Sequence, residues 1–370
     1  MLPTCDTPRI LFILKRRPDG PYGTWCYNAD GSPLDSGLSI SVKQVSYALT
    51  ELGIENKAVQ VIDNNCIDRE VTQYRPTIVI IEAFWVVPEK FEILRKLHPT
   101  VKWVIRNHSK MDFLSHEGSM IGWAVDYFRA GLTVASNSKE AVRDLAQLAV
   151  TAGADPSLSV YLPNYYKSGE VTGGFRVALA TFMRRNNLTS YIGFKTDEIN
   201  VGCFGAIRPL KNHLQQALAS IEVATELGVD LNFYINATRV EGRAESILVS
   251  LRSLFARFPQ HTLIEVPWMT HENFVEFIKT MDIVLQVSNS ETFNIVAADT
   301  VSVGVPVVVS DEIPWLGTEF HADPNNVENI RKKMLYVLTR NSCGLVQAEQ
   351  LKQLKTYCEQ SKVEWANYLQ

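Results

Sequence analysis

Hydrophobic residues along the chain form two kinds of segment in turn: short runs that are apolar throughout, and longer stretches with an apolar residue every three or four positions. The short runs are typical of buried strands and the longer stretches of amphipathic helices. Their alternation predicts βαβ units around a parallel sheet. In the first half we expect strands at 10–14, 58–62, 77–82, 101–106 and 132–135, and helices at 39–52, 67–74, 89–97, 120–128 and 139–150.

The same alternation starts again near residue 201, after a polar stretch with few apolar runs. Two such series predict an α/β protein with two doubly wound domains. In the second series we expect strands at 201–205, 231–235, 262–266, 283–287 and 305–309, and helices at 213–227, 245–258, 272–280 and 345–369.

The two series set the expected domain organisation. We expect a Rossmann-like N-terminal domain over 1–163, a linker over 164–199, a Rossmann-like C-terminal domain over 200–345, and a helix over 346–370 that packs back across the boundary. Parallel sheets of this kind bind ligands beyond the carboxyl ends of their strands. Two such sheets facing a central cleft would line it with strand-to-helix loops, so candidate chemistry is sought there.

The composition and charge of the chain disfavour several classes of function. The chain has 370 residues, of which 46% are hydrophobic and 21% charged, which is typical of a globular protein. The net charge of -4 disfavours a dedicated nucleic-acid binder. Six cysteines without a C-x-x-C pair predict reduced thiols, and the apolar runs are too short to span a membrane. We therefore expect a cytoplasmic protein with no integral membrane contact and no metal site.

The first loop with candidate chemistry follows the strand expected to end near Gly205. It places Arg208 and Lys211 just before a predicted helix N-terminus. Exposed backbone N–H groups and the helix dipole favour an anion there, and an arginine fork with a lysine suits phosphate oxygens. The alternative is a pair of solvated surface cations.

The second loop runs through Ser290 and Glu291 into a helix that contains Asp299. If that helix begins near residue 293, Glu291 stays on the loop while Asp299 lies inside the helix. Carboxylates accept hydrogen bonds from sugar hydroxyls, and acids at such positions hold the ribose in dinucleotide sites. The alternative is a helix N-terminal partner for Glu291 and a solvated helical acid for Asp299.

These two loops carry a family resemblance. The segment from Gly205 to Asn212, G-A-I-R-P-L-K-N, resembles the G-x-I-R-P-x-K-[GN] segment of retaining, nucleotide-sugar-dependent glycosyltransferases of family 4, which have the GT-B fold. The segment from Glu291 to Asp299 resembles that family's E-x(7)-E motif, and 304–307 resembles its trailing G-V-P-V strand. Here the second acid is aspartate, and Asn294 stands where glycine is common.

The resemblance implies roles for the matching residues. Arg208 and Lys211 would hold the donor diphosphate and stabilise its departure, Glu291 would lie beside the transferred sugar, and Asp299 would bind the ribose. Other residues are expected to line the donor, several of them through backbone amides: Gly205, Ser290, Thr292, Phe293 and Asn294. Enzymes of this fold do not normally need a metal, because the cations and the helix dipole offset the leaving charge.

The first half resembles the family mainly in its layout. Gly37 precedes the first long helix, in a position similar to the family's glycine-bearing loop near the diphosphate. His108 follows a strand where family members often carry a histidine near the reacting sugar, which makes it a catalytic candidate; the alternative is a satisfied loop histidine. Asn164 resembles the asparagine of the family's P-N crossover, for which we expect a structural role.

The sequence thus predicts a retaining hexosyl- or pentosyltransferase that uses a nucleoside-diphosphate sugar, with UDP and GDP as the favoured nucleotides, and carries no bound cofactor. Alternatives are a nucleotide-sugar epimerase of the same layout and a non-catalytic nucleotide-sugar-binding protein. The acceptor is open: a saccharide, or a hydroxymethylated base as in phage DNA modification. For DNA, the candidate contacts are 15–17 and 184–185 for the backbone, and Trp25, Tyr27 and Trp85 for stacking on a base.

Overall fold

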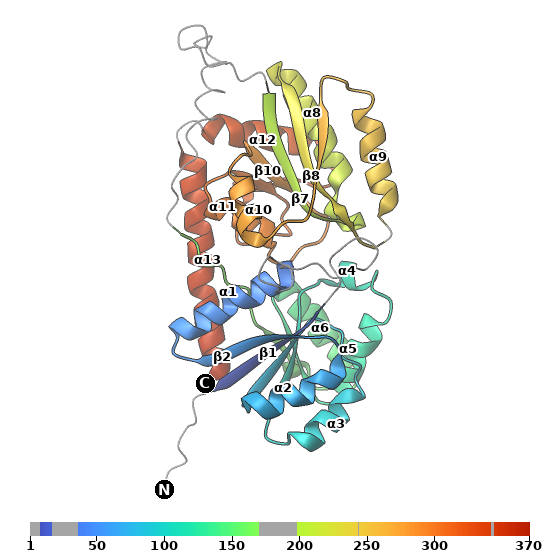
Figure 1. The fold of residues 1–370 in the computed structure, drawn as a ribbon, viewed down its shortest axis with the longest axis vertical. Helices are drawn as coiled ribbons and strands as arrows, with labels where there is room; N and C mark the ends of the chain where they lie inside the picture. Colours follow the sequence, from blue (N-terminus) through green and yellow to red (C-terminus); the bar gives the residue numbers. More distant parts are fainter. Residues whose placement is uncertain (1–7, 17–35, 170–197, 243, 342–343) are drawn as a thin grey trace. The chain divides into compact units, whose positions relative to one another are not determined.

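The computed structural model describes residues 8–16, 36–169, 198–242, 244–341 and 344–370 (Figure 1). Candidate contacts at Arg17, Trp25, Tyr27 and 184–185 lie outside the described residues. Two compact units divide the chain. Among the described residues, the first unit comprises 8–16, 36–167 and 357–370, and the second comprises 168–169, 198–242, 244–341 and 344–356.

The first unit contains a six-stranded parallel sheet in the order β2-β1-β3-β4-β5-β6. The strands are β1 (Arg9–Lys15), β2 (Glu55–Val61), β3 (Ile78–Glu82), β4 (Lys102–Asn107), β5 (Thr133–Ser136) and β6 (Ser159–Tyr161). The helices are α1 (Gly37–Glu51), α2 (Ile67–Tyr74), α3 (Lys90–Leu97), α4 (Met111–Leu114), α5 (Met120–Arg129) and α6 (Lys139–Thr151).

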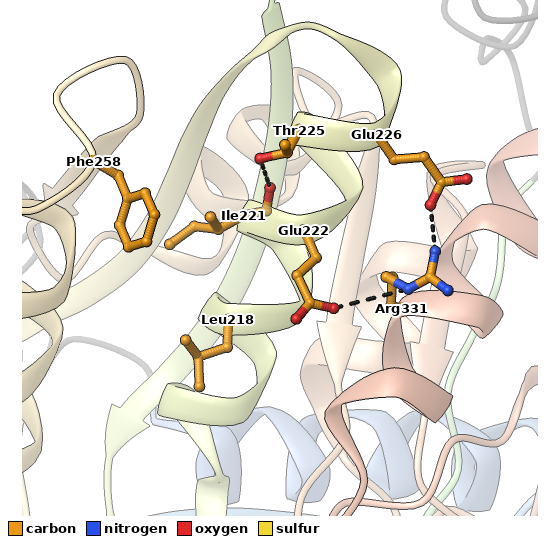
Figure 2. A pocket seen from close by; sticks show the side chains of 7 residues that line it. All are labelled: Leu218, Ile221, Glu222, Thr225, Glu226, Phe258 and Arg331. Carbon is orange, nitrogen blue, oxygen red and sulfur yellow. Dashed lines mark hydrogen bonds and ion pairs between the residues drawn. The ribbon is translucent and has the colours of Figure 1, made fainter.

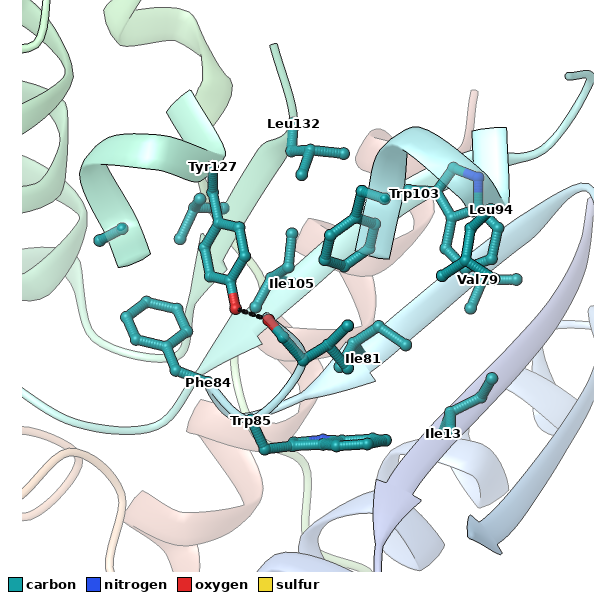
Figure 3. Packing of buried hydrophobic residues seen from close by; sticks show 14 of the residues in the cluster. Ile13, Val79, Ile81, Phe84, Trp85, Leu94, Trp103, Ile105, Tyr127 and Leu132 are labelled. Atoms are coloured by element: carbon teal, nitrogen blue, oxygen red, sulfur yellow. Dashed lines mark hydrogen bonds between the residues drawn. The ribbon is translucent and has the colours of Figure 1, made fainter. Parts of the chain in front are cut away.

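Alternating side chains of these strands build a core on each face of the sheet. Leu11 and Ile13 of β1 join a buried cluster with residues of β3, β4, α3 and α5 (Figure 3). Within it, the ring of Phe91 meets Tyr127 edge to face, with 5.7 Å between centroids, and Tyr127 donates its hydroxyl to the carbonyl of Val86. The paired hydroxyl explains how a tyrosine is tolerated at 0% exposure.

The second unit contains a five-stranded parallel sheet in the order β11-β10-β7-β8-β9. Its strands are β7 (Glu198–Ile207), β8 (Asp230–Val240), β9 (Thr262–Val266), β10 (Ile283–Gln286) and β11 (Val307–Val309). Its helices are α8 (His213–Leu227), α9 (Glu245–Phe255), α10 (His271–Ile278), α11 (Ile295–Ser302) and α12 (Val327–Arg340).

The last helix, α13 (Leu345–Leu369), begins in the second unit and ends in the first. In the second unit, Gln350 binds the backbone of Val307 through both ends of its amide, at 3.1 and 2.7 Å. In the first, Trp365 is 1% exposed, donates its indole N–H to the carbonyl of Pro163 (2.9 Å), and packs against Phe12 of β1. One helix therefore supplies core side chains to both units.

Two parallel sheets with interleaved helices confirm the predicted α/β fold class. Several details differ from the sequence-based expectation. The elements α4, β6 and α12 were not expected, β8 is longer than expected, and β7 ends at Ile207 rather than near Gly205. The strand continues because Gly205 forms a bulge at φ +112°, where its N–H donates to Asn236 Oδ1 (2.9 Å), and pairing resumes at Ala206.

Truncating Trp365 tests the contribution of α13 to the first unit. We expect Trp365→Ala to lower the free energy of unfolding by about 3–5 kcal/mol, because it empties a buried site and removes one of the hydrogen bonds to the Pro163 carbonyl. Val363→Ala is the matched control: Val363 lies on the same helix but is 58% exposed, so its effect should stay within about 0.5 kcal/mol. Denaturant unfolding measures both, and equal effects would contradict this packing.

Candidate functional site

The strand order of the second unit identifies where a ligand should bind. The chain moves from β7 to β8 and β9 on one side, then returns to place β10 and β11 on the other. Connections therefore leave β7 and β10 in opposite directions, and the space outside their carboxyl ends is the usual ligand position in such sheets. The loops that follow these two strands are the ones that carry Arg208, Lys211 and Glu291.

The loop after β7 is held in one shape by its neighbours. Asn212, which precedes α8, has a left-handed φ of 58°, a conformation that asparagine tolerates better than most residues. Its side-chain amide donates to the carbonyl of Val287 (3.0 Å). The backbone N–H of Asn289 donates to the carbonyl of Leu210 (2.8 Å). These bonds join the β7 loop to the β10 loop, so each loop supports the position of the other.

Lys211 and Glu291 form an ion pair across this junction. Their side chains are 17% and 12% exposed, so both are mostly shielded from water without being fully buried. Backbone contacts support the acid: the N–H of Glu291 donates to Glu312 Oε2 (3.1 Å). The sequence placed these two residues in separate motifs, and the structure brings them together at the carboxyl ends of β7 and β10.

Arg208 belongs to a second charged cluster that the sequence analysis missed. Its Nη2 lies 2.6 Å from Glu241 Oε2, and Arg239 Nε donates to the other oxygen of the same carboxylate, also at 2.6 Å. Burial would raise the pKa of Glu241, but the charges of the two arginines outweigh it and hold that pKa below its usual value. The Arg239 guanidinium also stacks on the ring of Trp268, 4.6 Å from its centroid.

Residues after Glu291 differ in what they can offer a ligand. Phe293 is 1% exposed and its carbonyl accepts the indole N–H of Trp315 (2.7 Å), so its side chain belongs to the core. Asn294 has φ 63°, caps α11 by accepting from the Ala297 N–H (2.9 Å), and donates to Gln286 (2.8 Å). The positive φ explains why an asparagine stands where the resembling family has glycine. Ligand contacts from these two residues would come from the backbone.

Ser290 and Thr292 flank Glu291, with Ser290 8% exposed and Thr292 partly exposed. Asp299 lies inside α11 and is 1% exposed, and its Oδ1 is 2.7 Å from Nε2 of His271, whose side chain is 21% exposed. Sequence reasoning did not find His271, because the residue lies at the start of α10 and matches no motif.

The first unit holds a separate polar cluster around the predicted His108. His108 Nε2 lies 2.5 Å from Glu82 Oε2, and Glu82 also pairs with Arg106; both acid and arginine are 0% exposed. Burial would raise the pKa of Glu82, but Arg106 and His108 outweigh it and hold that pKa below its usual value. Burial and the Arg106 charge lower the pKa of His108. The pair is therefore an ionised carboxylate beside a neutral imidazole at pH 7.

Hydrogen bonds extend this cluster to α1. Arg106 donates to Asn164 Oδ1 (2.6 Å), and the Asn164 amide donates to Ser41 Oγ (3.0 Å). Asn137 Nδ2 lies 3.4 Å from His108 Nδ1. Gly37 is the first residue of α1, with no atom within 4 Å of a Cβ added there. The network gives Asn164 a structural role and ties the His108 ring to the sheet.

A pocket of about 470 Å³ lies elsewhere in the second unit, on α8 and α12. Figure 2 shows Leu218, Ile221 and Phe258 on one side and Arg331 with two of its glutamate partners, Glu222 and Glu226, on the other. Its α8 residues begin at Leu218, beyond the helix N-terminus that follows Lys211. It is therefore distinct from the candidate site.

No group of three or more His, Cys, Asp or Glu side chains within the described ranges is arranged to hold a metal ion. Within those same ranges, no helix combines the length and apolar character needed to cross a membrane.

Because Glu241 lies between two arginines, we expect its carboxylate to compete with anionic ligands for them. We expect Glu241→Gln to tighten binding of inorganic pyrophosphate roughly two- to fivefold, because it removes a carboxylate that occupies Arg208 and Arg239. Calorimetric titration measures the change. Glu265→Gln is the matched control, since Glu265 pairs with Arg252 of α9 instead. A weaker or unchanged affinity in Glu241→Gln would contradict the proposed competition.

Because His213, the first residue of α8, is buried, we expect it to make the stability of the fold depend on pH. It is 2% exposed, and neither ring nitrogen has a hydrogen-bond partner among the described residues. Burial lowers its pKa to about 3, and the charge of Lys211 adds to the shift. The unfolded imidazole titrates near 6.5, so between these values the unfolded state binds more protons and acid destabilises the fold.

For each pH unit of acidification in that window, His213 alone should lower the free energy of unfolding by about 1.4 kcal/mol. We expect His213→Gln to reduce the slope of unfolding free energy against pH by that amount between pH 6.5 and 4.5. Urea unfolding at several pH values measures the slope, and an unchanged slope would show that His213 is not held neutral by burial.

Comparisons with known proteins show the fold. No protein-family model matches the chain, and a search of curated proteins finds no match. Three similar solved structures each cover nearly the whole chain. The α,α-trehalose-phosphate synthase (UDP-forming) from Burkholderia vietnamiensis has a TM-score of 0.66 at 12% identity, covering 98% of this chain and 97% of its own. The other two are the sucrose-phosphate synthase of Thermosynechococcus elongatus (0.64, 12%, 97% and 98%) and the E. coli trehalose-6-phosphate protein bound with UDP-2-fluoro glucose (0.63, 9%, 97% and 98%).

At these identities the likeness concerns architecture, and membership of family 4 stays a prediction. The neighbours are GT-B glycosyltransferase structures, and the match spans both units. The chain therefore has the GT-B fold, with two parallel-sheet α/β domains.

Proposed function

We propose that this protein is a retaining glycosyltransferase that moves a sugar from a nucleoside diphosphate to an acceptor hydroxyl. The observation that carries the proposal is the Lys211–Glu291 ion pair at the junction of the β7 and β10 loops, with Arg208 on the same loop as Lys211. A cation and an acid at this position suit the two parts of a nucleotide sugar: the diphosphate and the sugar hydroxyls.

The ion pairs that both cations already make support a role for these cations in binding anions. Arg208 and Lys211 each already hold a carboxylate, so both are positioned to bind an anionic oxygen. In the proposed reaction the diphosphate takes Lys211 from Glu291, which leaves the acid to accept hydrogen bonds from the transferred sugar. As the glycosidic bond breaks, the cations stabilise the charge that develops on the leaving phosphate.

Retention follows from the family resemblance rather than from geometry. In a front-face substitution the leaving phosphate takes the acceptor proton, so no separate base is needed. The proposal also does not require a metal, since Arg208, Lys211 and Arg239 together supply the positive charge that a phosphate leaving group needs. UDP and GDP sugars are the proposed donors; one structural neighbour is named as UDP-forming and another was bound with UDP-2-fluoro glucose.

The acceptor belongs to the first unit in this proposal, where His108 is held by Glu82. A saccharide is the acceptor that we favour over a hydroxymethylated DNA base. Trp85, a candidate for stacking on a base, is 9% exposed and lies in the hydrophobic cluster (Figure 3). It therefore has little surface to offer to a base.

Replacing Lys211 tests the proposed function. We expect Lys211→Ala to abolish sugar transfer and donor hydrolysis while keeping the fold, because it removes a cation that holds the diphosphate but little core surface. Release of nucleoside diphosphate from the donor that wild type uses measures the activity, and circular dichroism checks the fold. Lys279→Ala, which removes an exposed lysine after α10, is the matched control.

Normal turnover by a folded Lys211→Ala variant would overturn the assignment. If wild type binds a nucleotide sugar but neither transfers nor hydrolyses it, the protein is a non-catalytic nucleotide-sugar binder. Conversion of the donor to an isomeric nucleotide sugar would indicate an epimerase.

A further inference from the structure

We infer that Asn236 is a further binding residue for the donor diphosphate, to which it donates a hydrogen bond from its side-chain amide beside Lys211. The inference rests on the proposed function and adds to the same site a residue that no sequence motif contains. Asn236 lies in β8 and is 3% exposed. Polar side chains buried so deeply are normally hydrogen-bonded at each polar atom, so the bonds of its two amide atoms indicate its role.

A bulge in the neighbouring strand fixes one end of the amide. The register of β7 with β8 shifts between Cys203 and Ala206, which leaves Gly205 outside the ladder. The N–H of Gly205 donates instead to Asn236 Oδ1 at 2.9 Å. Only the oxygen of a side-chain amide accepts an N–H, so this bond also assigns the NH2 group to the other position of the side chain.

The other end of the amide is a donor without an acceptor. Asn236 Nδ2 makes no hydrogen bond within the part of the chain that the structure describes, and this nitrogen is not sealed off from solvent. An amide donor left without a partner in a buried side chain costs free energy. Because an NH2 group donates and does not accept, a ligand that satisfies it must bring an acceptor oxygen.

Gly205 places this donor beside the cation of the site. A Cβ added at Gly205 would lie 3.9 Å from Lys211 Nζ, and its φ of +112° is a conformation that favours glycine. The absent side chain leaves space next to the ammonium, on the residue whose N–H is held by Asn236. Lys211, Gly205 and Asn236 therefore border one position at the carboxyl ends of β7 and β8.

The diphosphate is the part of the donor that suits this position. Its oxygens accept hydrogen bonds and carry the negative charge that Lys211 is proposed to hold. Sugar and ribose hydroxyls also accept from an amide, but they offer no charge to the lysine. A neutral amide beside Lys211 adds a hydrogen bond to the phosphate without the desolvation cost of a second buried cation.

Two substitutions separate ligand binding from support of the bulge. Asn236→Asp keeps an oxygen for the Gly205 N–H but replaces the donor with an acceptor, whereas Asn236→Ala removes both. We expect Asn236→Ala to weaken binding of inorganic pyrophosphate, UDP and GDP roughly three- to tenfold, and Asn236→Asp to weaken it further, because its carboxylate repels the phosphate. If Asn236 only supported the bulge, Asn236→Ala would be the more damaging change. Calorimetric titration of the full chain measures binding, and circular dichroism checks the fold.

Ala237→Asp is the matched control for added charge. It places a carboxylate on the next residue of β8, which is partly exposed. Successive side chains of a strand point to opposite faces of the sheet, so we expect this variant to change binding by no more than about twofold. An effect as large as that of Asn236→Asp would show that charge alone weakens binding, and the inference would be overturned.

Nuclear magnetic resonance of isotope-labelled wild type provides a readout that needs no substituted protein. On titration with pyrophosphate, we expect the side-chain amide signals of Asn236 to shift and to saturate at the dissociation constant found by calorimetry. If those signals stay in place while pyrophosphate binds, or if Asn236→Ala binds it as tightly as wild type, the inference is wrong while the proposed function stands. If wild type binds neither UDP nor GDP, the proposed function fails and the inference fails with it.

Discussion

The ion pair between Lys211 and Glu291 joins the two loops on which the candidate site depends. It lies where the strand order of the second sheet reverses, so the charged residues lie at the position where such sheets usually bind ligands. A backbone hydrogen bond from Asn289 to Leu210 fixes the same junction without using the charged groups. The loops can therefore keep their shape when an anionic ligand takes the lysine, which is what a preformed phosphate site requires.

The ion pairs of the two units differ in how deeply they are buried. In the first, Arg106 and Glu82 are fully buried, and the arginine also donates to the carbonyls of Leu162 and Pro163. Removing either partner would leave an uncompensated buried charge, so this pair holds the strand ends and the His108 ring in place. In the second, the carboxylates that hold Arg208 and Lys211 remain partly exposed and can be exchanged for a ligand.

The sequence predicted the fold class and most element bounds, because buried strands and amphipathic helices leave clear patterns. It also identified the cations and the acid of the β7 and β10 loops, through motifs of adjacent residues. Glu82, Arg239, Glu241 and His271 were missed, since they come from the ends of three different strands, β3, β8 and β9, and match no motif. Their partners are fixed by sheet order and by bulges such as that at Gly205, which no local pattern encodes.

The most direct test of the central claim is a thermal-shift measurement on the wild-type chain with UDP, GDP, ADP, CMP and dTDP sugars. A ligand present at about 100 times its dissociation constant stabilises the folded state by about 2.7 kcal/mol. The account predicts a clear rise in melting temperature with at least one nucleotide sugar, and loss of that rise in Lys211→Ala. No shift with any of the five, or the same shift in both proteins, would contradict it.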